Sequence, residues 1–184
     1  SLVSINIPEG IDTIEYSVFN NCRSLTSITI PNSVTYISTG AFYKCTSLAS
    51  FTIPQSVRGI GNDAFSYTAF YNDSSNWNGH VLCKDNCLLE ARRLKGKYSV
   101  PNNIRLIAGS AFWHCDSLIS ITLHKGITNI NNSTFSGCEN LVSINIPNTV
   151  TSIGESAFRG CERLESIIIP EGVTTIGIHT FWYC

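Results

Sequence analysis

The residues with the clearest chemical potential in this chain are its eight cysteines, because thiols form disulfides, bind metals and act as nucleophiles. Six of them recur at a spacing of 23 residues or close to a multiple of it: Cys22, Cys45, Cys115, Cys138, Cys161 and Cys184. This spacing predicts one column in a stacked repeat, where parallel Cβ vectors disfavour the disulfide dihedral of about 90°. We expect buried, reduced thiols at 22, 45, 115, 138 and 161, packed as small apolar groups, and a more exposed Cys184.

Cys83 and Cys87 stand outside the column. They lie on either side of the short polar turn Lys84-Asp85-Asn86, between two strand-like segments. A disulfide between them and two free thiols both remain open. With His80 they supply three donors of the kind that zinc prefers, but a fourth ligand and a paired C-x-x-C motif are missing. We predict no metal and no cofactor.

Other chemistry-bearing patterns are missing from the sequence. It contains no G-x-S-x-G motif and no Gly-rich phosphate loop, and carboxylates such as Glu155, Glu162 and Glu165 have no reason to converge as an acid–base pair. We predict that the chain is not an enzyme. We expect His114, His124 and His179, which occupy variable positions, to face solvent.

Composition excludes two classes of partner. Charged residues make up 14% of the chain and the formal net charge is -1. The sequence has no basic stripe, so nucleic acid is an unfavourable partner, and it has no apolar run near the ~20 residues that a membrane span requires.

The elements that must position these residues follow from a repeat of 23 residues. Proline ends an apolar run at Pro8, Pro31 and Pro54, and again at Pro101, Pro147 and Pro170. Between Pro101 and Pro147, His124 occupies the equivalent position. Such a period is typical of a solenoid of stacked units.

One repeat, from Pro31, reads PNSVTYISTGAFYKCTSLASFTI. It contains an apolar pair three residues apart, a small residue before Phe, the column Cys, a Leu three residues later, and an alternating run such as Phe51-Thr52-Ile53. Alternation of apolar and small polar residues predicts a short strand with one buried face. Equivalent strands, stacked about 4.8 Å apart, would form a parallel sheet over a continuous core.

The pattern Leu-x-x-Ile-x-Ile, with Cys three residues before Leu and Pro after the last Ile, resembles a leucine-rich repeat. More narrowly, it resembles the BspA-like class of bacterial and protist surface proteins. The resemblance is carried by Val150–Gly154, Ala157–Cys161 and Leu164–Pro170, and it covers nearly the whole chain outside residues 71–97. It implies a mainly β leucine-rich-repeat solenoid, a right-handed superhelix with a parallel sheet of short strands.

We predict one solenoid domain over residues 1–184, interrupted once. Repeats start near residues 8, 31, 54, 101, 124, 147 and 170. Residues 71–97 depart from the pattern, and two strand-like segments, 80–83 and 87–91, predict a β-hairpin that replaces half of one coil and half of the next. Two interpretations stay open: a structural module that keeps the coils in register, and a loop that also binds a partner through Trp77, His80, Arg92 and Arg93.

In a leucine-rich repeat, the strand residues that point away from the core line the concave side. Here they form an almost uncharged ladder: Ser27, Thr29, Ser50, Thr52, Ser99, Ser120, Thr122, Ser143, Asn145 and Ser166. The ladder is either a solvated sheet face, which suits Thr and Ser, or a flat docking surface for a protein or a glycan.

The sequence favours a non-catalytic binding module that mediates adhesion or protein–protein contact. The resemblance implies an extracellular or cell-surface location and host matrix or surface proteins as partners. The alternatives are a self-assembling element of a longer repeat protein, with end-to-end association, and an accessory domain of an enzyme whose catalytic part lies elsewhere. The chain begins inside a strand and stops inside a coil, so we expect a portion of a longer protein. Asn72, Asn131 and Asn132 each begin an N-glycosylation triplet, and their use stays open.

Overall fold

The computed structural model describes residues 2–184 and divides the chain into two compact units, Ser1–Asp85 and Asn86–Cys184. Both units are mainly β, with short strands in parallel ladders and almost no helix. The expected fold class, a mainly β leucine-rich-repeat solenoid, is confirmed. The single domain expected over residues 1–184 stays a prediction.

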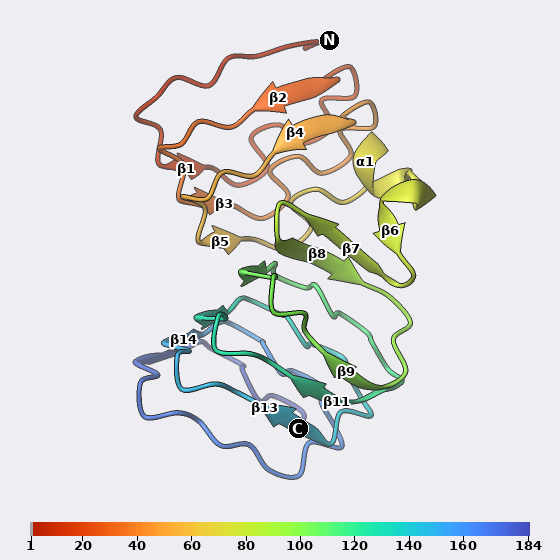
Figure 1. The fold of residues 1–184 in the computed structure, drawn as a ribbon, viewed down its shortest axis with the longest axis vertical. Helices are drawn as coiled ribbons and strands as arrows, with labels where there is room; N and C mark the ends of the chain where they lie inside the picture. Colours follow the sequence, from red (N-terminus) through yellow and green to blue (C-terminus); the bar gives the residue numbers. More distant parts are fainter. Residues whose placement is uncertain (1) are drawn as a thin grey trace. The chain divides into compact units, whose positions relative to one another are not determined.

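The first unit contains two parallel ladders (Figure 1). One ladder joins β2 (Ser27–Thr29) to β4 (Ser50–Thr52), with Ser27 opposite Ser50 and Ile28 opposite Phe51. The other joins β1 (Thr13–Ile14), β3 (Tyr36–Ile37) and β5 (Gly59–Ile60). Every paired residue lies 23 positions from its partner, so the sequence period is the register of both ladders.

The end of the first unit departs from the repeat. The chain forms α1 (Ala69–Asn72), the 3-10 turn η1 (Ser74–Asn76), β6 (Trp77–Asn78) and β7 (Val81–Lys84). The Thr68 hydroxyl caps α1 by accepting a hydrogen bond from the Tyr71 amide at 3.1 Å. β6 and β7 pair antiparallel around the Gly79-His80 turn, in which Gly79 has a φ of 61°.

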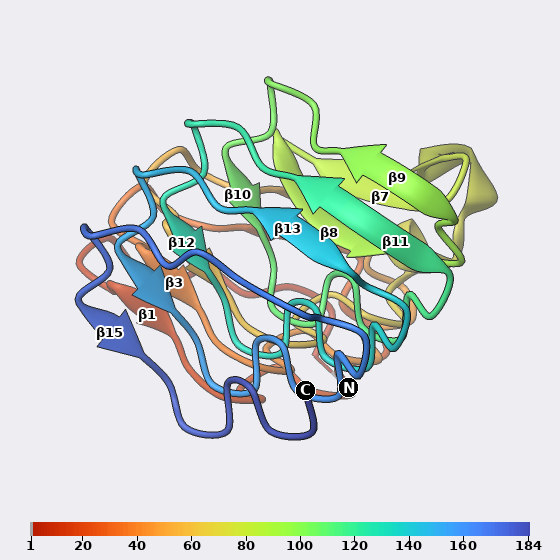
Figure 2. The same cartoon turned by 90° about the horizontal axis from the view of Figure 1, so that it is seen from below.

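The second unit repeats the two-ladder plan (Figure 2). β9 (Gly96–Ser99), β11 (Leu118–Thr122) and β13 (Ser143–Asn145) form one parallel sheet. β12 (Asn129–Ile130), β14 (Ser152–Ile153) and β15 (Thr175–Ile176) form the other. β8 (Cys87–Ala91) pairs parallel with β10 (Leu106–Ile107), so the irregular segment supplies a strand to the repeat.

Three differences from the sequence expectations stand out. The apolar pair of each repeat ends in a two-residue strand, so a second ladder exists that the sequence pattern did not predict. The expected last strand, 167–169, is irregular, and its inward residues Ile167 and Ile169 are only half-buried, because within the described residues this coil is covered from one side only. Ile168, which was expected to point outward, is 86% exposed. The expected strands around Lys84–Asn86 form as β7 and β8, linked by Asp85 and Asn86, which both have positive φ, while the β6–β7 hairpin was not foreseen.

A column of phenylalanine rings fills the core of each unit. In the second unit, Phe112, Phe135 and Phe158 are fully buried, and consecutive rings are stacked with centroids 5.2 and 5.4 Å apart. Phe19, Phe42 and Phe65 stack in the same way in the first unit, at 5.3 and 5.2 Å. Main-chain bonds run beside the rings, such as the Phe135 amide to the Ala157 carbonyl at 2.8 Å. The core side chains and the main-chain hydrogen bonds therefore both repeat once per coil.

Substituting Phe158→Ala tests this register. Phe158 is fully buried and stacks on Phe135 at 5.4 Å and on Phe181 at 5.7 Å, so its loss leaves a cavity between two coils. We expect a loss of roughly 3–5 kcal/mol in the free energy of unfolding, measured by chemical denaturation. Phe181→Ala is the matched control, since Phe181 is half-buried and should cost clearly less. Equal losses at both positions would contradict the stacking described here.

Candidate functional site

The cysteine column is part of the fold rather than a reactive site. Cys45, Cys138 and Cys161 are buried, and each thiol donates a hydrogen bond to the carbonyl of a Phe 26 residues earlier, over 3.0, 3.1 and 3.2 Å. Cys115 is also buried, and its thiol donates to the Ala91 carbonyl at 3.4 Å. All eight cysteines are free, and Cys184 is exposed as expected. Cys22 is only half-buried, which corrects the expectation of a fully buried thiol.

Burial keeps these thiols protonated. It raises the pKa of Cys45 and Cys115 to about 11 and that of Cys161 to about 12. The thiolate is the nucleophile and the metal ligand, so these three groups are inert at neutral pH. Their role is to satisfy one carbonyl in each coil while filling a small apolar space.

The raised pKa values predict a loss of stability at alkaline pH. An unfolded thiol ionises near pH 8.5, whereas the native thiols ionise at about 11 to 12. Their contribution to stability is therefore complete below about pH 8.5 and is lost as the pH rises towards the native pKa. We expect the melting temperature to fall over this range. Cys161→Ala should reduce the slope, while the buried control Val150→Ala should lower the melting temperature and keep the slope. Identical slopes for both variants and the parent chain would contradict this.

The residues predicted from the interrupting segment play different parts. The Trp77 indole N–H donates to the Tyr71 carbonyl at 2.8 Å, and the two rings meet edge to face at 5.7 Å, so Trp77 anchors the β6 strand. His80, Arg92 and Arg93 are exposed. Arg92 pairs with Glu90, with Nε to Oε1 at 2.6 Å. Trp77 thus has a clear structural use, and binding by the other three residues stays a prediction.

The predicted binding ladder lies on the exposed side of the strands. In β2 and β4 the middle residue, Ile28 or Phe51, is buried and the flanking Ser and Thr are exposed. In the second unit, Ser99, Thr122, Ser143, Asn145 and Ser166 are exposed and Ser120 is partly exposed. The alternation of the sequence therefore produces an exposed row of small polar groups in each unit, which is uncharged except for Lys97, the partner of Ser120 in the second unit.

Sequence reasoning missed one group of potential metal ligands. His114 Nδ1 lies 3.3 Å from Asp116 Oδ1, and a ligand atom of Glu139 completes a set whose members all lie within 4.8 Å of one another. Within residues 2–184 no other group of three His, Cys, Asp or Glu meets this criterion, so His80, Cys83 and Cys87 do not form one. All three side chains are exposed. The signal was present in the repeat, where Asp116, Glu139 and Glu162 share one position.

Two further sequence expectations are settled by local contacts. His114 and His179 are exposed as expected, but His124 is half-buried, and its Nδ1 accepts a hydrogen bond from the Gly126 amide at 3.0 Å. Of the possible glycosylation positions, Asn131 donates to the Ile107 carbonyl at 2.6 Å, and Asn132 accepts from the Glu155 amide at 2.9 Å. Both amides therefore already bond to neighbouring coils, whereas Asn72 is exposed at the end of α1.

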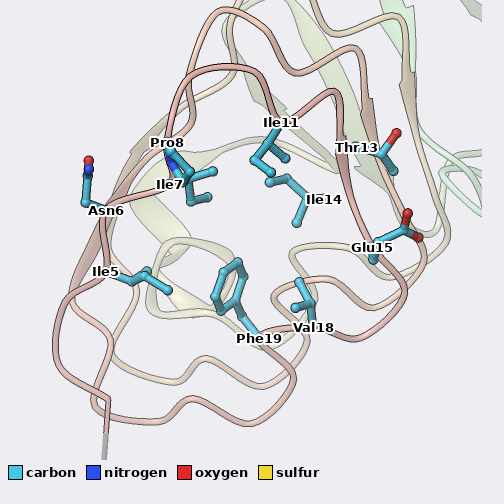
Figure 3. A pocket seen from close by; sticks show the side chains of 10 residues that line it. All are labelled: Ile5, Asn6, Ile7, Pro8, Ile11, Thr13, Ile14, Glu15, Val18 and Phe19. Carbon is cyan, nitrogen blue, oxygen red and sulfur yellow. The ribbon is translucent and has the colours of Figure 1, made fainter.

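The first coil encloses an apolar pocket of about 250 Å³ (Figure 3). Ile7, Ile11, Ile14 and Phe19 point into the space, while Thr13, Glu15 and Asn6 point away from it. Val18, which also lines the pocket, is 53% exposed. The pocket is the inner side of the same core that stacked coils cover elsewhere in this unit.

Comparison with known proteins identifies the repeat. A family model described as the BspA type leucine rich repeat region matches six copies, over residues 1–78 and 84–184. Among curated protein sequences, none matches the chain significantly. In the part of the chain that the structure describes, no helix has the length and apolar character needed to cross a membrane.

Several solved structures are similar to the chain. A leucine-rich repeat protein from Bacteroides ovatus is 28% identical, with 95% of this chain and 48% of that chain covered and a TM-score of 0.43. A leucine rich cell surface protein from Faecalibacterium prausnitzii is 30% identical, with 100% and 44% covered and a TM-score of 0.45. The T. pallidum leucine rich repeat protein is 28% identical, with 89% and 78% covered and a TM-score of 0.41. The chain thus spans about half the length of the first two.

Proposed function

Because the chain belongs to the BspA-type leucine-rich repeat family, we propose that it is a non-catalytic binding module that holds a protein partner against its strand face. The observation that carries the proposal is the exposed and almost uncharged row on the strands, represented by Thr29 and Thr52 in the first unit and by Thr122 in the second. Such a row offers many hydroxyl groups at a fixed spacing, and Lys97 is the one charge in it that docking would desolvate.

The rigidity of the stack supports the same function. Each strand residue is fixed by a parallel partner one coil away, so a ligand that docks on the row need not pay to order it. Family membership supports display at the cell surface or in secreted form, with adhesion to matrix or surface proteins as the biological role. The protonated column thiols and the scattered carboxylates support a role without catalysis.

Charge substitutions on the row test the proposal. We expect Thr29→Glu and Thr122→Glu to weaken binding to immobilised matrix proteins at least tenfold, because a buried unpaired carboxylate costs more than 1.4 kcal/mol. The measurement is surface plasmon resonance against a panel of matrix proteins, with a glycan array in parallel.

The matched controls are Thr46→Glu and Ser117→Glu, which place the same charge on exposed positions outside the strands. If all four variants bind a matrix protein as strongly as the parent chain does, the strand face is excluded as the docking surface. Binding confined to the glycan array would replace the protein partner by a glycan.

A second function, self-assembly, is favoured by the exposed coil ends. The pocket of the first coil leaves Val18 53% exposed, and in the last described coil Ile176 is 49% exposed, whereas the equivalent Ile153 is fully buried. These are the two sides of the contact that stacked coils make inside each unit. A head-to-tail contact of this kind is heterologous, so it does not close after two copies and leads to open chains.

Blocking each end separately tests self-assembly. We expect the parent chain to gain mass with concentration in light scattering, and Val18→Lys or Ile176→Lys to stop this growth. A mixture of the two variants should give dimers, because each keeps the end that the other lacks. Ile119→Lys is the control, an exposed apolar position away from both ends. Growth that persists in either end variant, or a parent chain that stays monomeric, would rule out the head-to-tail contact.

A further inference from the structure

The second unit has a gap in an otherwise continuous row of side chains. The residue before each column cysteine has a positive φ, and in most coils it carries a side chain: Asn21, Lys44, His114 and Tyr183. In two successive coils this residue is glycine, Gly137 and Gly160, with φ of 73° and 71°. About 10 Å of the stack therefore lacks side chains at this position.

The gap opens into a groove, which we call the glycine groove, with a volume of about 360 Å³. Gly137 and Gly160 lie between His114 and Tyr183, and Glu139 and Glu162 also line the space. The volume lies in the range of sites that bind small ligands or single side chains. The Cβ of an alanine at Gly137 would lie 2.7 Å from His114 Nδ1, so the glycine also allows the imidazole to lean over the groove.

The groove carries net negative charge. Within residues 2–184, no hydrogen bond or ion pair reaches the carboxylate of Glu139 or of Glu162. Two basic side chains line the groove: the His114 ring faces Asp116 at 3.3 Å, and Arg159 lies over the Trp182 ring, with the guanidinium carbon 4.6 Å from the ring centroid. Two unpaired carboxylates beside one engaged guanidinium favour a cationic ligand.

Aromatic rings at the groove favour an organic cation. Trp113 and Tyr183, which both line the groove, are 59% and 64% exposed. Large exposed aromatic rings are costly in water and are typical of binding hot spots. Their faces attract ammonium and guanidinium groups, and the attraction increases as the cation is desolvated.

We propose that the glycine groove binds a lysine or arginine side chain of a partner protein. The cationic head lies between Glu139 and Glu162, and the alkyl stem crosses the backbone of Gly137 and Gly160 between the aromatic rings. The proposal deepens the protein-binding function and rests on it, but it concerns a surface other than the strand face.

A metal ion at His114, Asp116 and Glu139 is the competing interpretation of the same region. It accounts for three donors at one end of the groove. It explains Gly137, which makes room for the His114 ring, but it gives no reason for Gly160, for the unpaired Glu162 or for the exposed Tyr183. The organic cation accounts for all of these, so the metal is treated as an outcome of the test.

The test is an NMR titration of the ¹⁵N-labelled chain in buffer with a chelator. The probes are the N-acetyl methylamides of lysine and arginine, with norleucine as the neutral analogue of lysine. We expect saturable shifts of the Trp113 indole and the Gly160 amide with both cations, and at least fivefold weaker binding of norleucine. Glu139→Gln with Glu162→Gln should weaken lysine binding on the order of tenfold. Glu155→Gln, outside the groove, should leave it unchanged.

Gly160→Asn blocks the groove without disturbing the fold. Asparagine tolerates this backbone conformation and occupies the same position at Asn21, where φ is 64°. A Cβ at Gly160 would meet only Gly137 backbone atoms at 3.7 Å, an ordinary contact. We expect an unchanged melting temperature and no saturable shift with lysine.

Several results would overturn the proposal. Equal binding of the norleucine and lysine probes would show that the positive charge is not recognised. Unchanged lysine binding in Gly160→Asn would show that the groove is not the binding site. A third arm titrates Zn²⁺ alone without chelator. Saturation by Zn²⁺ that His114→Gln abolishes, with no response to lysine, would assign the region to a metal. Because the probes are small molecules, these results do not depend on whether the strand face binds a protein.

Discussion

The stacking of one coil on the next is the contact on which the rest of this molecule depends. Main-chain bonds such as Phe42 N–H to the Ala64 carbonyl, at 2.8 Å, join equivalent positions of successive coils. The same period brings the Phe42 and Phe65 rings to 5.2 Å. A single coil buries too little apolar surface to fold alone, so each coil is stable only with a neighbour, and every side chain is positioned by the repeat.

This constraint explains which parts of the fold the sequence predicted. A residue type that must fill the same space in every coil recurs visibly, which is why the column of buried thiols, the Phe stack and the alternating strands such as Ser27–Thr29 were predicted correctly. Two-residue strands such as Tyr36–Ile37 were missed, because two residues carry no alternation to recognise. Expectations also failed at Cys22, which is only half-buried, and at the strand 167–169, which is irregular, since burial and pairing there depend on a contact that periodicity alone does not guarantee.

The candidate sites were harder to predict for a related reason. The strand face follows from alternation, and its exposure agrees with the pattern in both units. The glycine groove exists because two residues, Gly137 and Gly160, have no side chain. Gly137 and Gly160 could be read in the sequence as Gly-Cys pairs, but the positive φ that makes this position a turn, and the groove that results, require the backbone. His114, Asp116 and Glu139 meet only because two coils are adjacent.

Repetition also decides where chemistry can occur in such a molecule. Buried positions are equivalent in every coil, and the same desolvation that stabilises the stack raises the pKa of Cys45 and Cys161 and makes them inert. Reactive or selective groups must therefore lie where consecutive coils differ. In the second unit one such difference is a glycine where other coils carry a side chain, beside the carboxylates of Glu139 and Glu162. A regular strand face supplies area, and the irregular groove supplies discrimination between ligands, because only the irregular positions distinguish one coil from the next.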